Sequence, residues 1–139
     1  MAHSPLHDPA RPEAPTNTGL HINFLYGIAA FVLIIIFTMA GALTPGTFLL
    51  GPIMEELTKV QLARNAREGV AAGLGFGIME TAAYGGNNII IWMLRSISTI
   101  PLHAGMTGMA AQGISQSRLL PLVVAIGIHA SYNGILRLF

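Results

Sequence analysis

The sequence contains no cysteine and few charged residues. Without cysteine the chain can form no disulfide, no thiolate metal site and no cysteine nucleophile. Charged residues make up 9% of the 139 residues, against roughly a quarter in an average soluble domain. A soluble protein of this length would need more charges to cover its surface. The net charge of +1 gives no argument for nucleic-acid binding, so no nucleic-acid partner is expected.

Apolar residues are abundant instead. Hydrophobic residues make up 53% of the chain, in long runs, and sixteen residues are glycine. This composition predicts an all-α integral membrane protein, a bundle of about five membrane helices surrounded by membrane lipids. The glycines would let neighbouring helices approach closely. We expect helices over residues 20–43, 47–65, 68–94, 102–114 and 119–138, with breaks at 44–46 and 96–101 and a polar link at 112–118.

The N-terminal segment differs from the rest. Residues 1–19 are polar and rich in proline, and such a segment cannot bury enough apolar surface to fold alone. We expect a tail that is disordered or held by a partner. Residues 20–139 then form a single transmembrane helical domain, in keeping with the short length of the chain.

The arginines predict a membrane topology. Of the arginines expected in the tail and the loops, four fall on one side of the membrane and two on the other: Arg11, Arg64, Arg67 and Arg118 against Arg95 and Arg137. By the positive-inside rule the N-terminus is cytoplasmic. The chain is therefore expected to be a multi-pass protein of the cell inner (cytoplasmic) membrane.

A few ionisable residues interrupt the apolar runs. Two acids and a lysine lie within residues 51–59, and in a helix Glu55 and Lys59 would be at i and i+4, within pairing distance. The later runs carry one such residue each, namely Glu80, His103 and His129. A charge at bilayer depth costs roughly 2.5 kcal/mol or more, so such residues normally face a protein interior and serve a function. Glu55, Glu80, His103 and His129 are therefore expected to converge on one cluster.

Local spacing adds neighbours to this cluster. Three residues, Phe76, Tyr84 and Asn87, share a helix face with Glu80, and Asn133 follows His129 at i+4. Carboxylates, imidazoles and an amide in one pocket can activate water and stabilise an oxyanion. The same set also matches a zinc site with histidine and glutamate ligands and an open water position.

Four motifs carry a resemblance to a known family. They are Glu55-Glu56-x-x-Lys59, Gly73-Leu74-Gly75-Phe76-x-x-x-Glu80, Arg95 to His103, and His129-x-x-x-Asn133. In this order they resemble the motifs of the PrsW family of intramembrane proteases, which is distantly related to the CAAX prenyl proteases. The resemblance covers residues 51–139, the protease-like core. Thr81 stands where many members have an asparagine, and the family usually has additional membrane helices.

The resemblance implies an intramembrane peptidase that hydrolyses peptide bonds of membrane proteins, with anti-sigma factors among its substrates. It implies that Glu55 is the base or a metal ligand and that Glu56 assists. The site would be completed by Glu80, His103 and His129, with Asn133 near the oxyanion. If the enzyme uses a metal, zinc would be held by Glu55, Glu80, His103 and His129. Glutamate-driven and metal-dependent chemistry are both consistent with the motifs.

Other interpretations stay open from the sequence. One is a non-catalytic subunit with the protease fold, which docks onto a larger membrane complex through residues 1–43. Another is a proton or ion carrier that uses Glu80 and the histidines as a relay. Structural explanations are also available, because Glu55 and Lys59 could be a helix-surface pair and His129 and Asn133 could form an interhelical hydrogen bond. Packing or interface roles suit Tyr84, Trp92 and Tyr132.

Overall fold

The computed structural model describes residues 17–39, 50–86 and 88–136, and these residues form helices joined by short connections. Over the described residues, the prediction of an all-helical protein with about five helices is confirmed. The helices are α1 (Asn17–Met39), α2 (Leu50–Val60), α3 (Ala66–Tyr84), α4 (Ile89–Ser115) and α5 (Leu120–Leu136).

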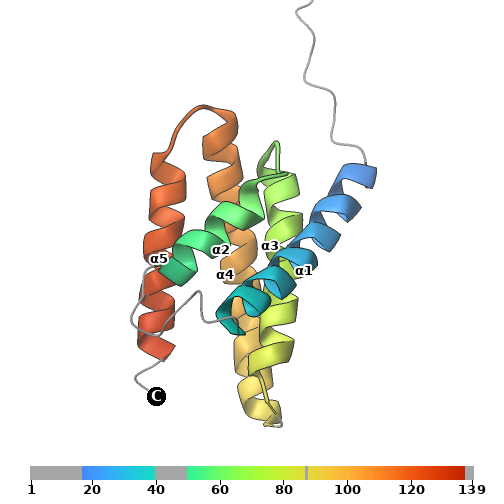
Figure 1. Ribbon diagram of the computed structural model, residues 1–139, viewed down its shortest axis with the longest axis vertical. Helices are drawn as coiled ribbons and strands as arrows, with labels where there is room; N and C mark the ends of the chain where they lie inside the picture. The colour runs from blue at the N-terminus through green and yellow to red at the C-terminus, as the bar shows by residue number, and fades with distance from the viewer. Residues whose placement is uncertain (1–16, 40–49, 87, 137–139) are drawn as a thin grey trace, which may run out of the picture.

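An antiparallel pair, α3 and α4, forms the centre of the bundle (Figure 1). α5 packs on α4, and α1 crosses α3 obliquely. The short α2 contacts each of the other four helices. This position matters for function because α2 carries the paired acids and the lysine.

The predicted boundary between the third and fourth helices is wrong. α3 ends at Tyr84, and α4 runs without a break from Ile89 through Pro101. The reversal is made by Gly86, which has a φ of +58°, a conformation that glycine adopts without steric cost. Asn88 then caps α4, accepting hydrogen bonds from the backbone N–H groups of the second and third residues after it. Proline removes one helical hydrogen bond, but a packed helix tolerates this loss.

Other boundaries shift by a few residues. α2 covers Leu50–Val60 instead of 47–65, and residues 61–65 are not helical. Asn65 caps α3 by accepting a hydrogen bond of 3.1 Å from the Glu68 backbone, while the Glu68 carboxylate accepts one of 2.8 Å from the Arg64 backbone. Residues 17–19, predicted as tail, form the first turn of α1. The rest of that tail, residues 40–49, Asn87 and residues 137–139 lie outside the described residues.

Two of the helices are long and apolar enough to cross a membrane, over residues 17–37 and 89–115. Among the described helices, α5 is apolar but shorter. α2 has 11 residues, or about 16 Å of helix, against roughly 30 Å of hydrocarbon. By length and composition the structure thus offers two candidate spans where about five were expected.

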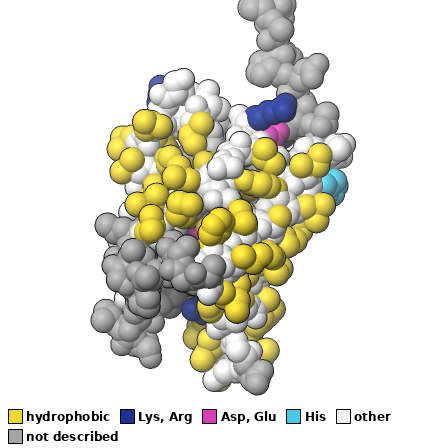
Figure 2. Space-filling view, in the orientation of Figure 1, with side chains coloured by type: hydrophobic (Ala, Val, Ile, Leu, Met, Phe, Trp, Pro, Cys, Tyr) yellow, Lys and Arg dark blue, Asp and Glu magenta, His cyan; other side chains and the backbone are white. Residues whose placement is uncertain are grey.

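The interior of the bundle holds many large polar side chains, and much of its exterior is apolar. The largest fully buried side chains are Lys59, Glu56, His103, His129, Thr81, Thr99, Thr107 and a single apolar one, Phe76. Large hydrophobic side chains are exposed along α1, the first half of α4 and α5. Figure 2 shows such side chains over much of the visible face, with few charged ones among them. This is the reverse of the usual arrangement in a soluble domain.

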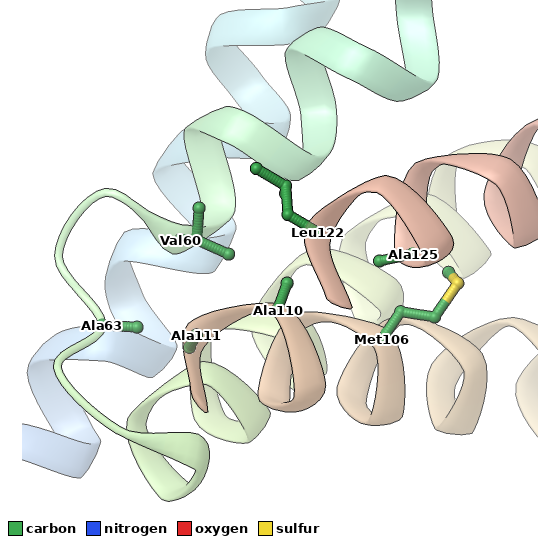
Figure 3. Close-up of a cluster of buried hydrophobic side chains, with 7 residues drawn as sticks. All are labelled: Val60, Ala63, Met106, Ala110, Ala111, Leu122 and Ala125. Carbon is green, nitrogen blue, oxygen red and sulfur yellow. The ribbon is translucent and has the colours of Figure 1, made fainter. Parts of the chain in front are cut away.

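Two apolar clusters hold the helices around this polar interior. One joins the end of α2 and its loop to α4 and α5 (Figure 3) and consists of Val60, Ala63, Met106, Ala110, Ala111, Leu122 and Ala125. The other joins α1 to α3 and consists of Ala30, Phe31, Ile34 and Phe76. Val60 directly follows Lys59, and Phe76 contacts His103. The clusters therefore fix the helices on either side of the buried polar residues.

Glycines bring α3 against its neighbours, as the composition predicted. Gly69, Gly73 and Gly77 recur every four residues and face α4. A Cβ atom at Gly73 would run into the His103 carbonyl and lie 2.8 Å from the Ala104 Cα. The backbone that carries His103 can therefore lie directly on α3, which is the packing that small residues permit in membrane helices.

A methyl group at this position should loosen the bundle. Gly73→Ala is expected to destabilise the protein by about 1–3 kcal/mol, because the added Cβ must push α4 away from α3. The measurement is unfolding of the full chain in mixed micelles. Gly105→Ala is the matched control, since a Cβ there meets nothing within 4 Å. Equal stability of the two variants would show that the α3–α4 contact is not tight.

Candidate functional site

The predicted polar residues meet in one buried cluster. The acids and lysine of α2 lie against Glu80 of α3, His103 of α4 and His129 of α5. Four of these side chains are at most 1% exposed, namely Glu56, Lys59, His103 and His129. The convergence expected from the cost of isolated charges is therefore present in the structure. The packing of α2 across the bundle produces it.

Lys59 lies at the centre of the cluster. Its ammonium donates a hydrogen bond to Glu56 Oε1 and lies 2.8 Å from His103 Nδ1. The predicted pairing of Lys59 with Glu55 is wrong, because the lysine turns inward to its i−3 neighbour. A helix-surface pair is also excluded, since the side chains of Lys59 and Glu56 are both 0% exposed.

Glu80 connects His103 to Arg95. One carboxylate oxygen is hydrogen-bonded to His103 Nε2, and the other lies 3.9 Å from Arg95 Nη1. The sequence placed Arg95 beyond the end of a helix, but it occupies the second turn of α4. Its guanidinium also lies over the Tyr84 ring, 5.6 Å from the centroid. Arg95 is therefore part of the site. It is not a loop residue, so it cannot be used to predict which side of the membrane a loop lies on.

His129 lies between the two adjacent acids of α2. Its Nδ1 is 2.9 Å from Glu56 Oε1, and its Nε2 is 3.4 Å from Glu55 Oε2. That Glu55 oxygen is buried and has no hydrogen-bond partner. The Glu55 side chain is nevertheless 16% exposed, whereas Glu56 is fully enclosed. Of the two adjacent acids, Glu55 is thus the more open one.

The charges of the cluster do not balance. The cluster holds three carboxylates, on Glu55, Glu56 and Glu80, and two cationic side chains, on Lys59 and Arg95. With both histidines neutral, one negative charge remains, and an unbalanced buried charge is costly. A further positive charge, carried by a proton or a metal ion, would balance the cluster. One place for it is the gap between Glu55 Oε2 and His129 Nε2, where the carboxylate oxygen makes no hydrogen bond.

Three of the four predicted metal ligands are close enough to hold an ion. Ligand atoms of Glu55, His103 and His129 lie within 4.8 Å of one another, and Glu80 is not in this group. The 3.4 Å between Glu55 Oε2 and His129 Nε2 matches the edge of a zinc tetrahedron, about 3.3 Å for bonds of about 2.0–2.1 Å. Both ring nitrogens of His103 are engaged, by Lys59 and Glu80. Two ligands therefore fit zinc, and the third would first have to release a partner.

Asn133 is not joined to the cluster. It is partly buried and makes no side-chain hydrogen bond within the described part of the chain. The neighbouring Tyr132 does make hydrogen bonds. Its hydroxyl is 2.8 Å from Ser98 Oγ and 2.9 Å from Thr99 Oγ1. This contact joins α5 to α4, in line with the packing role considered for Tyr132. Asn87, expected on the Glu80 face, lies outside the described residues.

Sequence reasoning missed the roles of Lys59 and Arg95. Lys59 is the only lysine of the chain, and a single lysine beside two acids in an apolar chain was a signal of burial. Phe76 was placed correctly on the face of Glu80. Its ring lies 5.1 Å from the His103 ring and 4.5 Å from the Lys59 nitrogen.

Comparison with protein-family models, with curated proteins and with solved structures gives no match for this chain. The function therefore has to be argued from the residues and their geometry.

Proposed function

We propose that the chain is a membrane-embedded peptidase of the PrsW type, in which Glu55 and His129 activate a water molecule. One observation carries the proposal. Glu55 Oε2 is a buried oxygen without a hydrogen-bond partner, 3.4 Å from His129 Nε2, on a side chain that is 16% exposed. The four motifs that resemble the family contribute the residues around it. A membrane protein such as an anti-sigma factor would be the substrate.

A membrane location is supported by the two candidate spans and by the polar interior beneath exposed apolar side chains. The loop before α3, with Arg64, and the turn after α4, with Arg118, lie at one end of the bundle, since the Ala66 backbone donates to Gln112 Oε1. By the positive-inside rule that end faces the cytoplasm. α1 begins toward the same end (Figure 1). We therefore place the N-terminus in the cytoplasm and the bundle in the inner membrane.

The proposed reaction uses the protein's own acids and bases. Glu55 takes a proton from water as the water oxygen forms a bond to the carbonyl carbon. The oxyanion collapses, the C–N bond breaks, and the proton passes to the leaving nitrogen, giving a carboxylic acid and an amine. Glu56 accepts the Nδ1–H of His129, which keeps the imidazole nitrogen Nε2 directed at Glu55. By the resemblance, Asn133 would stabilise the oxyanion.

Zinc is the metal that would suit this donor set, held by Glu55 and His129, with His103 as a third ligand only if its ring released Lys59 or Glu80. When bound, it would make its water a nucleophile near neutral pH and polarise the carbonyl. In this structure both ring nitrogens of His103 are hydrogen-bonded, one to Lys59 and the other to Glu80.

The proposal is tested by mapping new peptide ends. The full chain is produced in a bacterial cytoplasmic membrane, and new N-termini are identified by mass spectrometry. The control is the double variant Glu55→Gln/His129→Gln. We expect new N-termini within or beside membrane spans with the natural chain alone. Equal sets of termini would contradict the proposal, and they would favour a non-catalytic subunit of a larger membrane complex.

A further inference from the structure

Lys59 is a buried ammonium group with partners of three kinds. Its side chain is 0% exposed, and a buried charge requires compensation on all sides. The Glu56 carboxylate accepts one hydrogen bond. His103 Nδ1 lies 2.8 Å away, and the face of Phe76 lies 4.5 Å away. These partners belong to α2, α4 and α3, so a single side chain connects three helices.

The chemistry of an ammonium group fixes the direction of the contact with His103. A lysine ammonium donates three hydrogens and has no lone pair. His103 Nδ1 must therefore accept, so it carries no hydrogen. The one hydrogen of the neutral ring is then on Nε2, and it is donated to Glu80. The two contacts of the imidazole thus require the same tautomer.

We infer that Lys59 is a positioning residue, which holds His103 as the neutral Nε2–H tautomer and, through His103, fixes the Glu80 carboxylate. As a role in catalysis this rests on the proposed peptidase function. It divides the predicted site in two. Lys59, His103 and Glu80 form a supporting half with no free nitrogen on the imidazole, and Glu55 and His129 form the reactive half. His103 is therefore neither the general base nor a metal ligand while Lys59 is in place.

The surroundings of His103 favour one fixed ring orientation. The Phe76 ring packs against it with centroids 5.1 Å apart, and the His129 ring meets it edge-on at 4.8 Å. A Cβ atom at Gly77 would lie 3.4 Å from His103 Cβ and from Cδ2, so α3 closes that side. Rotating the ring by half a turn would place carbon atoms against both Lys59 and Glu80. The enclosure and the hydrogen bonds therefore select the same state.

Nuclear magnetic resonance of the full chain in detergent micelles can test this assignment directly. Selective ¹⁵N labelling of histidine reports whether each ring nitrogen carries hydrogen, and His103→Gln identifies the signals of this ring. Labelled lysine gives a single side-chain signal, since Lys59 is the only lysine. In the natural chain we expect His103 Nδ1 without hydrogen and Nε2 with it. Hydrogen on Nδ1 would overturn the inference.

Two substitutions test the part played by Lys59. In Lys59→Met the donor is lost while Glu80 still accepts from Nε2, so the ring is free to take up a second proton, and Nδ1 should carry hydrogen in part of the molecules. Lys59→Arg keeps a cationic donor and should preserve the original state. An unchanged Nδ1 signal in a folded Lys59→Met variant would show that the lysine does not set the tautomer.

Activity provides a second readout. Lys59→Met is expected to lower kcat roughly 10–100-fold with little change in KM, because Lys59 also holds Glu56, which orients His129, and Lys59→Arg should recover part of the loss. The two proposals can fail separately. A natural chain with the expected tautomer but no peptidase activity would refute the function and support the Lys59–His103 assignment. An active chain with hydrogen on Nδ1 would do the opposite.

Discussion

Glu55→Gln is expected to lower the rate of peptide-bond cleavage by about 10²–10⁴-fold, the usual contribution of a general base. Glutamine keeps the shape of the side chain but cannot take a proton from water. The fold should persist, because Glu55 Oε2 makes no hydrogen bond that the substitution could remove. The measurement is kcat on a substrate identified by its new N-terminus, together with the helical circular dichroism of the variant.

Glu68→Gln is the matched control for this prediction. It is the same change at another buried acid, in the first turn of α3. The glutamine carbonyl can still accept the hydrogen bond from the Arg64 backbone, so activity should be retained. Undiminished cleavage by Glu55→Gln would exclude Glu55 as the base and would refute the proposed mechanism.

The sequence was sufficient to predict the buried cluster of Glu55, Glu80, His103 and His129. The prediction rests on the free-energy cost of an unpaired ionisable group, and it does not require the exact ends of the helices. An ionisable group in an apolar run must find a partner wherever the run begins or stops. The third and fourth helices were divided incorrectly, at residues 96–101 instead of at Gly86, yet Glu80 and His103 still face each other. The error lay in reading Pro101 as a break and in passing over the adjacent Gly-Gly turn.

The partners within the cluster could not be predicted. Helical periodicity places Glu55 and Lys59 on one face, but it does not say which neighbouring helix that face meets. α2 contacts four other helices, and on its buried side Lys59 turns toward His103 and shares Glu56 with His129. The same limit applies to Asn133, whose spacing from His129 is correct for one face but which lies outside the hydrogen-bonded cluster.

Glu55 and Glu56 are adjacent in sequence, but they differ in burial and in hydrogen bonding, and we expect them to have different roles. Glu56 Oε1 is shared by the Lys59 ammonium and His129 Nδ1, and the side chain is fully buried. Glu55 approaches only the far nitrogen of His129 and is partly open. Substituting the first of these acids should therefore impair chemistry, whereas substituting the second should impair the fold.

Glu56→Leu is expected to destabilise the protein by about 3–5 kcal/mol, the usual cost of removing one partner of a buried ion pair. The Lys59 ammonium would remain in an apolar interior with an imidazole and an aromatic face as its contacts. The double variant Glu56→Leu/Lys59→Met removes both charges and should recover part of this loss. Full recovery is not expected, because His103 and His129 would each lose a partner.

Unfolding in mixed micelles measures these differences, with Glu55→Gln as the comparison because it changes the neighbouring acid. Its stability should stay within about 1 kcal/mol of the natural chain, since its contact with His129 is long and partly open. Equal stability of Glu56→Leu and the natural chain would mean that Lys59 and Glu56 are not a closed ion pair. A double variant less stable than Glu56→Leu would likewise contradict the argument, because the charge left unpaired would then not be the source of the loss.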